Sequence, residues 1–120
     1  MEANFQRIAK TYSSEFEVAK KYYTIVFGLN DIHLTKHELN LVAFSAVNGT
    51  ISTPPIKEQF CKEFNISSAS IYNIIGKLKK LDILIKDKDN KIRVNPIILP
   101  NFGLHSNIVL VIKMLKDGTA

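Results

Sequence analysis

The sequence predicts a mainly α-helical domain that carries a small β-hairpin, and three observations lead to this prediction. Four segments have helix start and stop signals around apolar residues at helical spacing. Two of these predicted helices are separated by only three residues, 65–67. After the fourth helix, the spacing of apolar residues becomes alternating on both sides of a turn.

The first two helices begin at capping boxes, in which a Ser or Thr and a Glu three residues later satisfy free backbone donors. The two boxes are Ser14 with Glu17, and Thr35 with Glu38. The helices are predicted over residues 15–28 and from Thr35 to about residue 48. Gly28 and Gly49 are expected to end them, because glycine adopts the left-handed conformation that often follows a helix.

The third and fourth helices form a pair with a tight connection. Pro54 suits the first position of the third helix, where its missing N–H costs nothing. Asn65 is a left-handed cap for this helix, and Ser67 caps the fourth helix over residues 68–81. Helices joined by so short a turn cross at a steep angle, which is the helix-turn-helix arrangement.

A hairpin follows directly. Residues 83–87 and 91–95 are β-prone runs, and the turn formers Lys88, Asp89 and Asn90 lie between them. A basic hairpin after the second helix of such a pair is typical of a wing. Residues 106–116 are predicted as a last helix, with a strand as the alternative because the segment is rich in β-branched residues.

The chain is expected to have three parts: an N-terminal helical extension (1–34), the helix pair with its wing (35–98), and an apolar C-terminal segment (99–120). The core of residues 35–95 is expected to be self-sufficient. Its predicted members are Leu39, Leu41, Val42, Ile56, Phe60, Ile71, Ile75 and Leu78, with Ile83 and Ile85 or their neighbours.

Positive charge is concentrated in one part of the chain, whose formal net charge is +5. Residues 77–93 carry seven basic and three acidic side chains, whereas residues 1–34 carry four of each. A local basic patch on a balanced chain is expected of a protein that binds a polyanion. The alternative is a lysine-rich surface that only contacts solvent.

The number of cysteines and the hydropathy of the chain indicate the expected cellular compartment. Cys61 is the only cysteine, so no internal disulfide can form, and a reducing compartment is expected. The N-terminal residues have no apolar signal core. The most apolar run, residues 108–115, is far shorter than the roughly 20 residues that span a bilayer. We therefore expect a cytoplasmic protein that does not enter a membrane.

The fourth helix has two distinct sides at 100° per residue. Ile71, Ile74, Ile75 and Leu78 form the apolar side, and Ala69, Asn73, Gly76 and Lys80 lie opposite. Small residues on the outward line allow close approach to another surface, and Asn73 can bond an adenine edge. The candidate DNA-binding residues are Ser68, Ala69, Ser70, Tyr72, Asn73, Lys77, Lys79, Lys80, Lys88, Lys91 and Arg93.

The stretch from Thr35 to Ile98, about half the chain, resembles the winged helix-turn-helix domains of MarR-type regulators and of replication initiators of small plasmids. The matching positions are Ser67, Ser70, Ile71, Ile75 and Leu78, followed by Asp82, Ile83 and Leu84. Asp82 stands where these domains usually have glycine. Asn73 stands where they often have arginine, which argues against strong guanine recognition.

We therefore expect a double-stranded DNA-binding protein, a transcriptional regulator that reads the major groove with helix 68–81 and phosphates with the wing 83–95. Replication initiation is a close variant with the same chemistry. A winged-helix adaptor for protein interactions, associated with a phage or a polymerase, is the alternative from another class, because fold alone does not fix function.

Proteins of this class commonly pair to read two half-sites, so we also expect a homodimer. Residues 15–28 and 106–116 of both copies would form its interface, because both segments are markedly apolar. The alternative is that these segments close over their own domain.

Catalysis, a cofactor and a metal are not expected. The sequence has no HExxH motif, no phosphate-binding glycine loop and no nucleophile elbow. His37 is expected at the surface, and Cys61 is expected to be an inert buried thiol.

Overall fold

Four α-helices are followed by a two-stranded hairpin and a short 3₁₀ helix in the computed structural model, which describes residues 14–100 and 102. The elements are α1 (Glu15–Leu29), α2 (Lys36–Asn48), α3 (Pro54–Phe64), α4 (Ser68–Lys80), β1 (Leu84–Lys86), β2 (Ile92–Val94) and η1 (Pro96–Ile98). The expected order of helices and hairpin is confirmed. The expected element at residues 106–116 lies outside the described residues.

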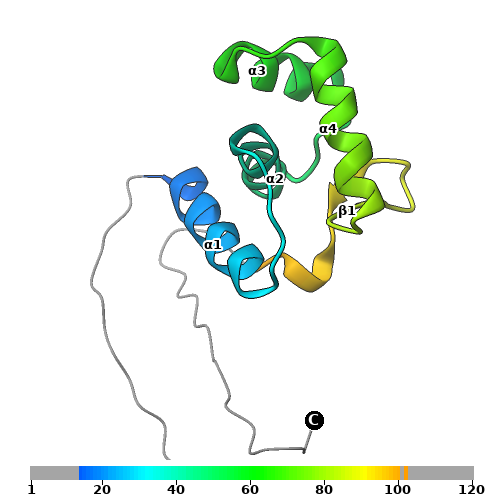
Figure 1. The fold of residues 1–120 in the computed structure, drawn as a ribbon. Helices are drawn as coiled ribbons and strands as arrows, with labels where there is room; N and C mark the ends of the chain where they lie inside the picture. The colour runs from blue at the N-terminus through cyan, green and yellow to red at the C-terminus, as the bar shows by residue number, and fades with distance from the viewer. Residues whose placement is uncertain (1–13, 101, 103–120) are drawn as a thin grey trace, which may run out of the picture.

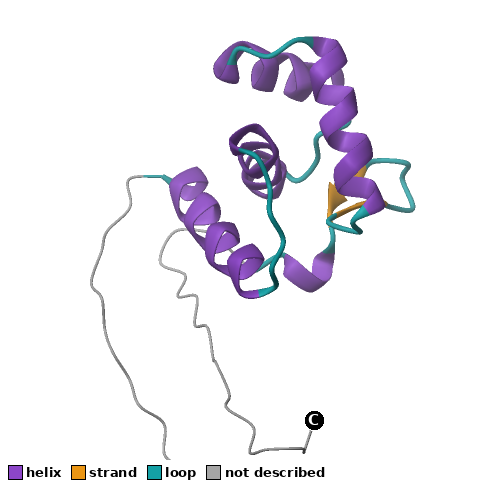
Figure 2. Cartoon of the chain, viewed as in Figure 1, coloured by secondary structure: helices purple, strands orange, loops and turns teal. Residues whose placement is uncertain are grey.

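α2 lies at the centre of the fold, between α1 on one side and the α3–α4 pair on the other (Figure 1). α4 runs at a steep angle to α3. The hairpin lies beside the C-terminal end of α4, and Figure 2 shows its short strands in orange at this place. The chain then turns back towards α1 through η1.

Three helices end at an Asp or Asn in the left-handed conformation, and each of these residues is followed by an isoleucine. The left-handed residues are Asp31, Asn65 and Asp82, with φ of 56°, 52° and 58°. The next N–H bonds a carbonyl five residues back: Ile32 to Phe27 at 2.9 Å, Ile66 to Cys61 at 3.1 Å and Ile83 to Leu78 at 3.0 Å. This is the Schellman arrangement, which satisfies carbonyls that the helix leaves free.

The prediction that Gly28 ends the first helix is wrong, because α1 continues to Leu29. The chain reverses at Asp31, which is one of the few residue types that adopt the left-handed conformation without glycine. At the other predicted stops, Gly49 and Asn65, the left-handed conformation is confirmed, with φ of 83° and 52°.

The core extends beyond the predicted set. Leu41, Val42, Phe60, Ile71, Ile75, Leu78 and Ile83 are buried as expected, but Leu39, Ile56 and Ile85 are only half-buried. Ile85 pairs with Arg93 on one face of the hairpin, whereas Leu84 and Val94 pair on the opposite face and are buried. Strand alternation therefore places Leu84, and not Ile85, in the core.

The core is also not confined to residues 35–95, because α1 contributes to the same cluster. Ala19, Tyr23 and Phe27 are buried in it, and Phe102 joins it from beyond the hairpin. The Tyr23 hydroxyl donates a hydrogen bond of 2.7 Å to the carbonyl of Ile98. Burial raises the pKa of Tyr23 well above its usual value, so the phenol stays protonated and keeps this bond.

Candidate nucleic-acid interface

The start of α4 is fixed by its own serines. Ser67 accepts a hydrogen bond from the backbone N–H of Ser70 at 3.1 Å, and its hydroxyl donates to the Ser70 hydroxyl at 2.9 Å. Three residues separate α3 from α4, and the left-handed Asn65 makes the turn. The first turn of α4, including Ser68 and Ala69, is thereby held at the surface.

The two sides of α4 are separated as predicted. Ile71, Ile75 and Leu78 are at most 5% exposed and pack into the core. The candidate residues on α4 are all exposed, namely Ser68, Ala69, Ser70, Tyr72, Asn73, Lys77, Lys79 and Lys80. α4 therefore presents a surface of small, polar and basic side chains.

Gly76 lies on this exposed surface. A Cβ atom added at Gly76 would have no heavy atom within 4 Å among the described residues. No described helix therefore requires glycine at this position, although glycine costs about 1 kcal/mol relative to alanine within a helix. Residue 76 therefore borders open space on the exposed side of α4.

Lys77 is engaged within the protein. Its Nζ lies 2.9 Å from Oε2 of Glu38, the residue that also caps α2. Burial acts to raise the pKa of Glu38, but the hydrogen bonds from Thr35 and Lys77 outweigh it and hold the pKa below its usual value. Lys77 thus links α4 to the start of α2, in addition to any interaction it makes outside.

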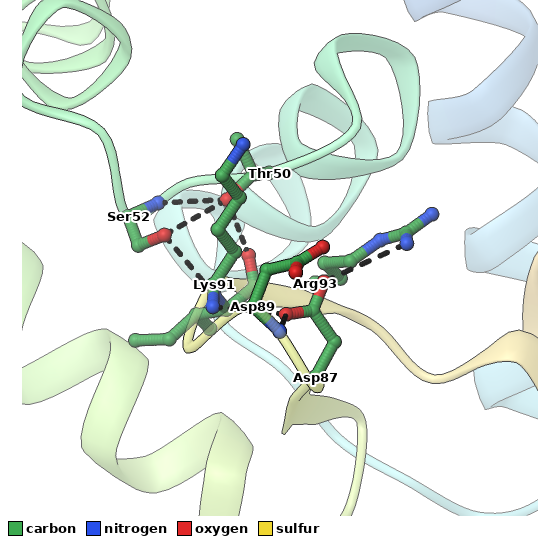
Figure 3. Close-up of polar contacts among 7 residues, drawn as sticks. Thr50, Ser52, Asp87, Asp89, Lys91 and Arg93 are labelled. Atoms are coloured by element: carbon green, nitrogen blue, oxygen red, sulfur yellow. Dashed lines mark hydrogen bonds and ion pairs between the residues drawn. The ribbon is translucent and has the colours of Figure 1, made fainter.

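The hairpin loop is organised by Asp87. Its Oδ1 accepts backbone hydrogen bonds from Asp89 at 2.8 Å and Lys91 at 3.0 Å (Figure 3). Its Oδ2 lies 3.6 Å from Nη1 of Arg93. The hydrogen bond from the N–H of Lys91 is the main cause that lowers the pKa of Asp87, so the carboxylate stays ionised and continues to accept these bonds.

The connection between α2 and α3 runs beside β2, an arrangement that was not predicted. The N–H of Ile51 bonds the carbonyl of Ile92 at 3.1 Å, and the Thr50 hydroxyl bonds the same carbonyl at 2.8 Å. Ser52 accepts the N–H of Ile92 at 3.1 Å (Figure 3). These bonds fix the hairpin to the helices; the β-branched Thr50 and Ile51 were the available signal.

Lys57 of α3 contacts the exposed side of α4, and this contact was also not predicted. Its ammonium lies 4.7 Å from the centre of the Tyr72 ring and 3.3 Å from the Tyr72 hydroxyl. No sequence signal pointed to this pair, because Lys57 and Tyr72 lie on different helices. Tyr72 itself is 59% exposed, and its polar partner is on α3 and not on the hairpin.

A groove of about 480 Å³ lies between α3 and α4 beside this pair. Its lining includes Lys57, Glu58, Cys61, Ser68 and Tyr72. The prediction that Cys61 is a buried thiol is wrong: the side chain is half-buried, because it packs against the edge of the core and also lines this groove.

The basic side chains differ in their partners. Within residues 14–100, Lys77 and Arg93 each pair with a carboxylate, whereas Lys79, Lys80, Lys88 and Lys91 make no ion pair. All six are exposed. The hairpin loop, yellow in Figure 1, joins β1 to β2 beside α4, and Lys88 and Lys91 belong to this loop.

Two other kinds of site are absent from the part of the chain that the structure describes. No group of three or more His, Cys, Asp or Glu side chains there lies close enough to hold a metal ion. None of the helices described is long and apolar enough to cross a membrane.

Comparison with known proteins gives no relative. No protein-family model matches the chain, and no curated protein or solved structure is significantly similar to it.

Proposed function

We propose that this chain is a winged helix-turn-helix protein that binds double-stranded DNA, with α4 in the major groove and the hairpin on the phosphate backbone. The observation that carries the proposal is the exposed face of α4 beside the hairpin. Four exposed lysines of α4 and the adjoining hairpin loop, Lys79, Lys80, Lys88 and Lys91, have no acidic partner among the described residues. Unpaired lysines on one surface are suited to neutralise phosphates.

The shape and chemistry of α4 support the same function. The major groove is about 12 Å wide and admits one α-helix. Ala69 and Gly76 keep the outward line narrow, and Asn73 is exposed between them with an amide that can pair with adenine. The side chains at the start of α4, such as Ser68, can bond phosphates and fix the helix in position.

The biological role that we propose is transcriptional regulation in the cytoplasm, with replication initiation as a variant on the same surface. A protein-interaction adaptor is the second candidate, and exposed apolar side chains favour it. Ile97 of η1 is 89% exposed and Leu29 of α1 is 56% exposed, and neither lies on α4 or the hairpin. Leu29 also suits a subunit interface.

We further propose that two copies pair through α1. Ile25 and Leu29 are 39% and 56% exposed, and they lie on one side of the helix because they are four residues apart. The opposite side of α1 is already used, since Tyr23 and Phe27 are buried in the core of the same chain. The expected contribution of residues 106–116 lies outside the described residues.

The direct test is a gel-shift selection from a pool of random duplexes with the full chain, followed by a salt titration of the complex. We expect an enriched sequence and an affinity that falls steeply with salt, by a slope of about −0.9 per neutralised phosphate. Absence of binding to every duplex at low salt, by a folded protein, would reject DNA binding and leave the adaptor function.

A further inference from the structure

We propose that Lys57 of α3 and Tyr72 of α4 form a two-residue clamp that holds one backbone phosphate of the DNA. The clamp rests on the proposed function and adds Lys57 to the binding surface. Charge and sequence spacing did not identify it, because α3 has a balanced charge, with two lysines and two glutamates.

The first step is the fixed position of the ammonium group. Lys57 is placed over the Tyr72 ring at 4.7 Å and against its hydroxyl at 3.3 Å. A free lysine side chain samples many rotamers, and ordering it opposes binding. Tyr72 therefore holds the Lys57 charge in place before a ligand arrives, by a cation–π interaction and a hydrogen bond.

The second step concerns protons. The ammonium has three N–H groups, and Lys57 uses one of them on the Tyr72 oxygen. The phenol oxygen accepts this bond, so its own O–H remains available as a donor. No other described residue bonds the Tyr72 hydroxyl, and Lys57 makes no ion pair with Glu58 or with any other described carboxylate. The Lys57 ammonium and the Tyr72 hydroxyl are thus two adjacent donors, one of them charged, that remain available to an acceptor on a bound ligand.

The third step favours a phosphate over a base. A lysine ammonium is a compact charge that binds phosphate as a point charge, and a pair of groups that only donate matches no base edge except one with acceptors alone, such as guanine O6 and N7. The backbone at the start of α3 offers few donors of its own, because Pro54 and Pro55 lack N–H groups. A phosphate that lies against the groove between α3 and α4 therefore depends on the side chains of Lys57 and Tyr72.

The test compares Lys57→Gln, Tyr72→Phe and the double variant with the wild-type full chain. Lys36→Gln is the control, because it removes the same charge from an exposed position at the start of α2, away from the proposed DNA and dimer surfaces. Binding is measured by fluorescence anisotropy on the selected duplex and on a random-sequence duplex, over a range of salt. Circular dichroism verifies that each variant is folded.

Each single variant is expected to weaken binding to both duplexes by about 5- to 10-fold, the loss of one charge-assisted hydrogen bond. The double variant is expected to lose little more than the weaker-binding single variant, because both groups act on one phosphate. Lys57→Gln is also expected to reduce the salt slope by about 0.9, whereas Lys36→Gln leaves the affinity and the slope unchanged.

Three results would overturn the clamp. In the first, the wild-type chain binds DNA but Lys57→Gln binds as tightly as the Lys36→Gln control. In the second, the losses of the two single variants add fully. In the third, Tyr72→Phe changes sequence preference without weakening binding to random DNA, which would assign Tyr72 to a base. A wild-type chain that binds neither duplex would instead reject the proposed function, and the clamp with it.

Discussion

Lys77 of α4 reaches Glu38 at the start of α2, where its Nζ lies 2.9 Å from Oε2 and 3.0 Å from Oε1. The same carboxylate accepts the backbone N–H of Thr35 at 2.8 Å. One glutamate therefore both caps α2 and sets the position of α4. A residue predicted to lie near DNA thus also has a structural partner 39 positions away in sequence.

Replacing Glu38 with alanine should lower the free energy of unfolding by about 1–2 kcal/mol at neutral pH, because the variant has neither the cap nor the ion pair with Lys77. The bonds from Thr35 and Lys77 outweigh burial and lower the pKa of Glu38. A lowered pKa stabilises the fold above the ordinary carboxyl pKa, and this stability is lost as the pH falls through the folded-state value.

Urea unfolding at neutral and acidic pH measures this effect. The difference between wild type and Glu38→Ala should shrink in acid. Glu58→Ala, at an exposed position on α3, is the control and should change stability by no more than about 0.5 kcal/mol. A difference that does not depend on pH would show that the ionised carboxylate contributes nothing.

The double variant Lys88→Ala/Lys91→Ala should weaken binding to all duplexes alike and reduce the salt slope by about 0.9 for each phosphate that the protein no longer neutralises. Both side chains are exposed in the hairpin loop, and neither makes an ion pair among the described residues. Lys20→Ala/Lys36→Ala removes the same charge from positions outside the hairpin, α4 and the Ile25–Leu29 side of α1, and is the control. Unchanged affinity in the hairpin variant would exclude the wing from the DNA interface.

Asn73→Ala should cost on the order of 1–3 kcal/mol of binding free energy on the preferred duplex, if the amide pairs with an adenine. Binding to random DNA should change little, because interactions with base edges carry the sequence information. Asn73 is exposed, so the fold is expected to tolerate alanine. Competition between the two duplexes measures the effect, and an equal loss on both would assign Asn73 to the backbone.

Gly76→Ala should raise the free energy of unfolding by about 1 kcal/mol, because the added Cβ meets open space and alanine favours the helix. Binding to DNA should nevertheless weaken, since the methyl group holds α4 away from the groove floor. Gly28→Ala on α1 also adds a Cβ in open space and is the matched control. Equal affinity of Gly76→Ala and wild type would show that close approach at residue 76 is not needed.

The helices and the hairpin could be predicted from the sequence because their signals are local. Each helix start carries its own signal: the Thr35–Glu38 capping box, Pro54 and Ser67. The hairpin is signalled by the change in the spacing of apolar residues from helical to alternating, which also depends only on neighbouring residues. The end of α1 was misplaced because glycine was preferred over Asp31 as the left-handed residue. An Asp or Asn followed by isoleucine at residues 31, 65 and 82 was the signal that would have corrected it.

The site could be predicted only in part, because its interactions join residues far apart in the chain. The exposed face of α4 follows from helical periodicity, and the structure has it as expected. The partners of its side chains do not follow from periodicity. Lys77 with Glu38, Tyr72 with Lys57, and Thr50 with Ile92 are separated by 39, 15 and 42 positions.

The double variant Ile25→Asn/Leu29→Asn should convert the proposed homodimer to a monomer. Both residues are exposed on one side of α1, so polar replacements remove apolar surface without opening the core. Ile97→Asn, at a position 89% exposed on η1, is the control for a general loss of surface hydrophobicity.

Light scattering on a size-exclusion column at micromolar concentration determines the mass. We expect a dimer for wild type and for Ile97→Asn, and a monomer for the α1 variant. The monomer should bind paired half-sites far more weakly than the dimer but a single half-site about equally, because linked sites gain from effective concentration. Deleting residues 104–120 tests whether that segment also belongs to the interface, since the truncated chain should then be monomeric as well. A wild-type monomer that still binds DNA would reject pairing through α1, and the exposed side chains of Ile25 and Leu29 would then have to serve another partner.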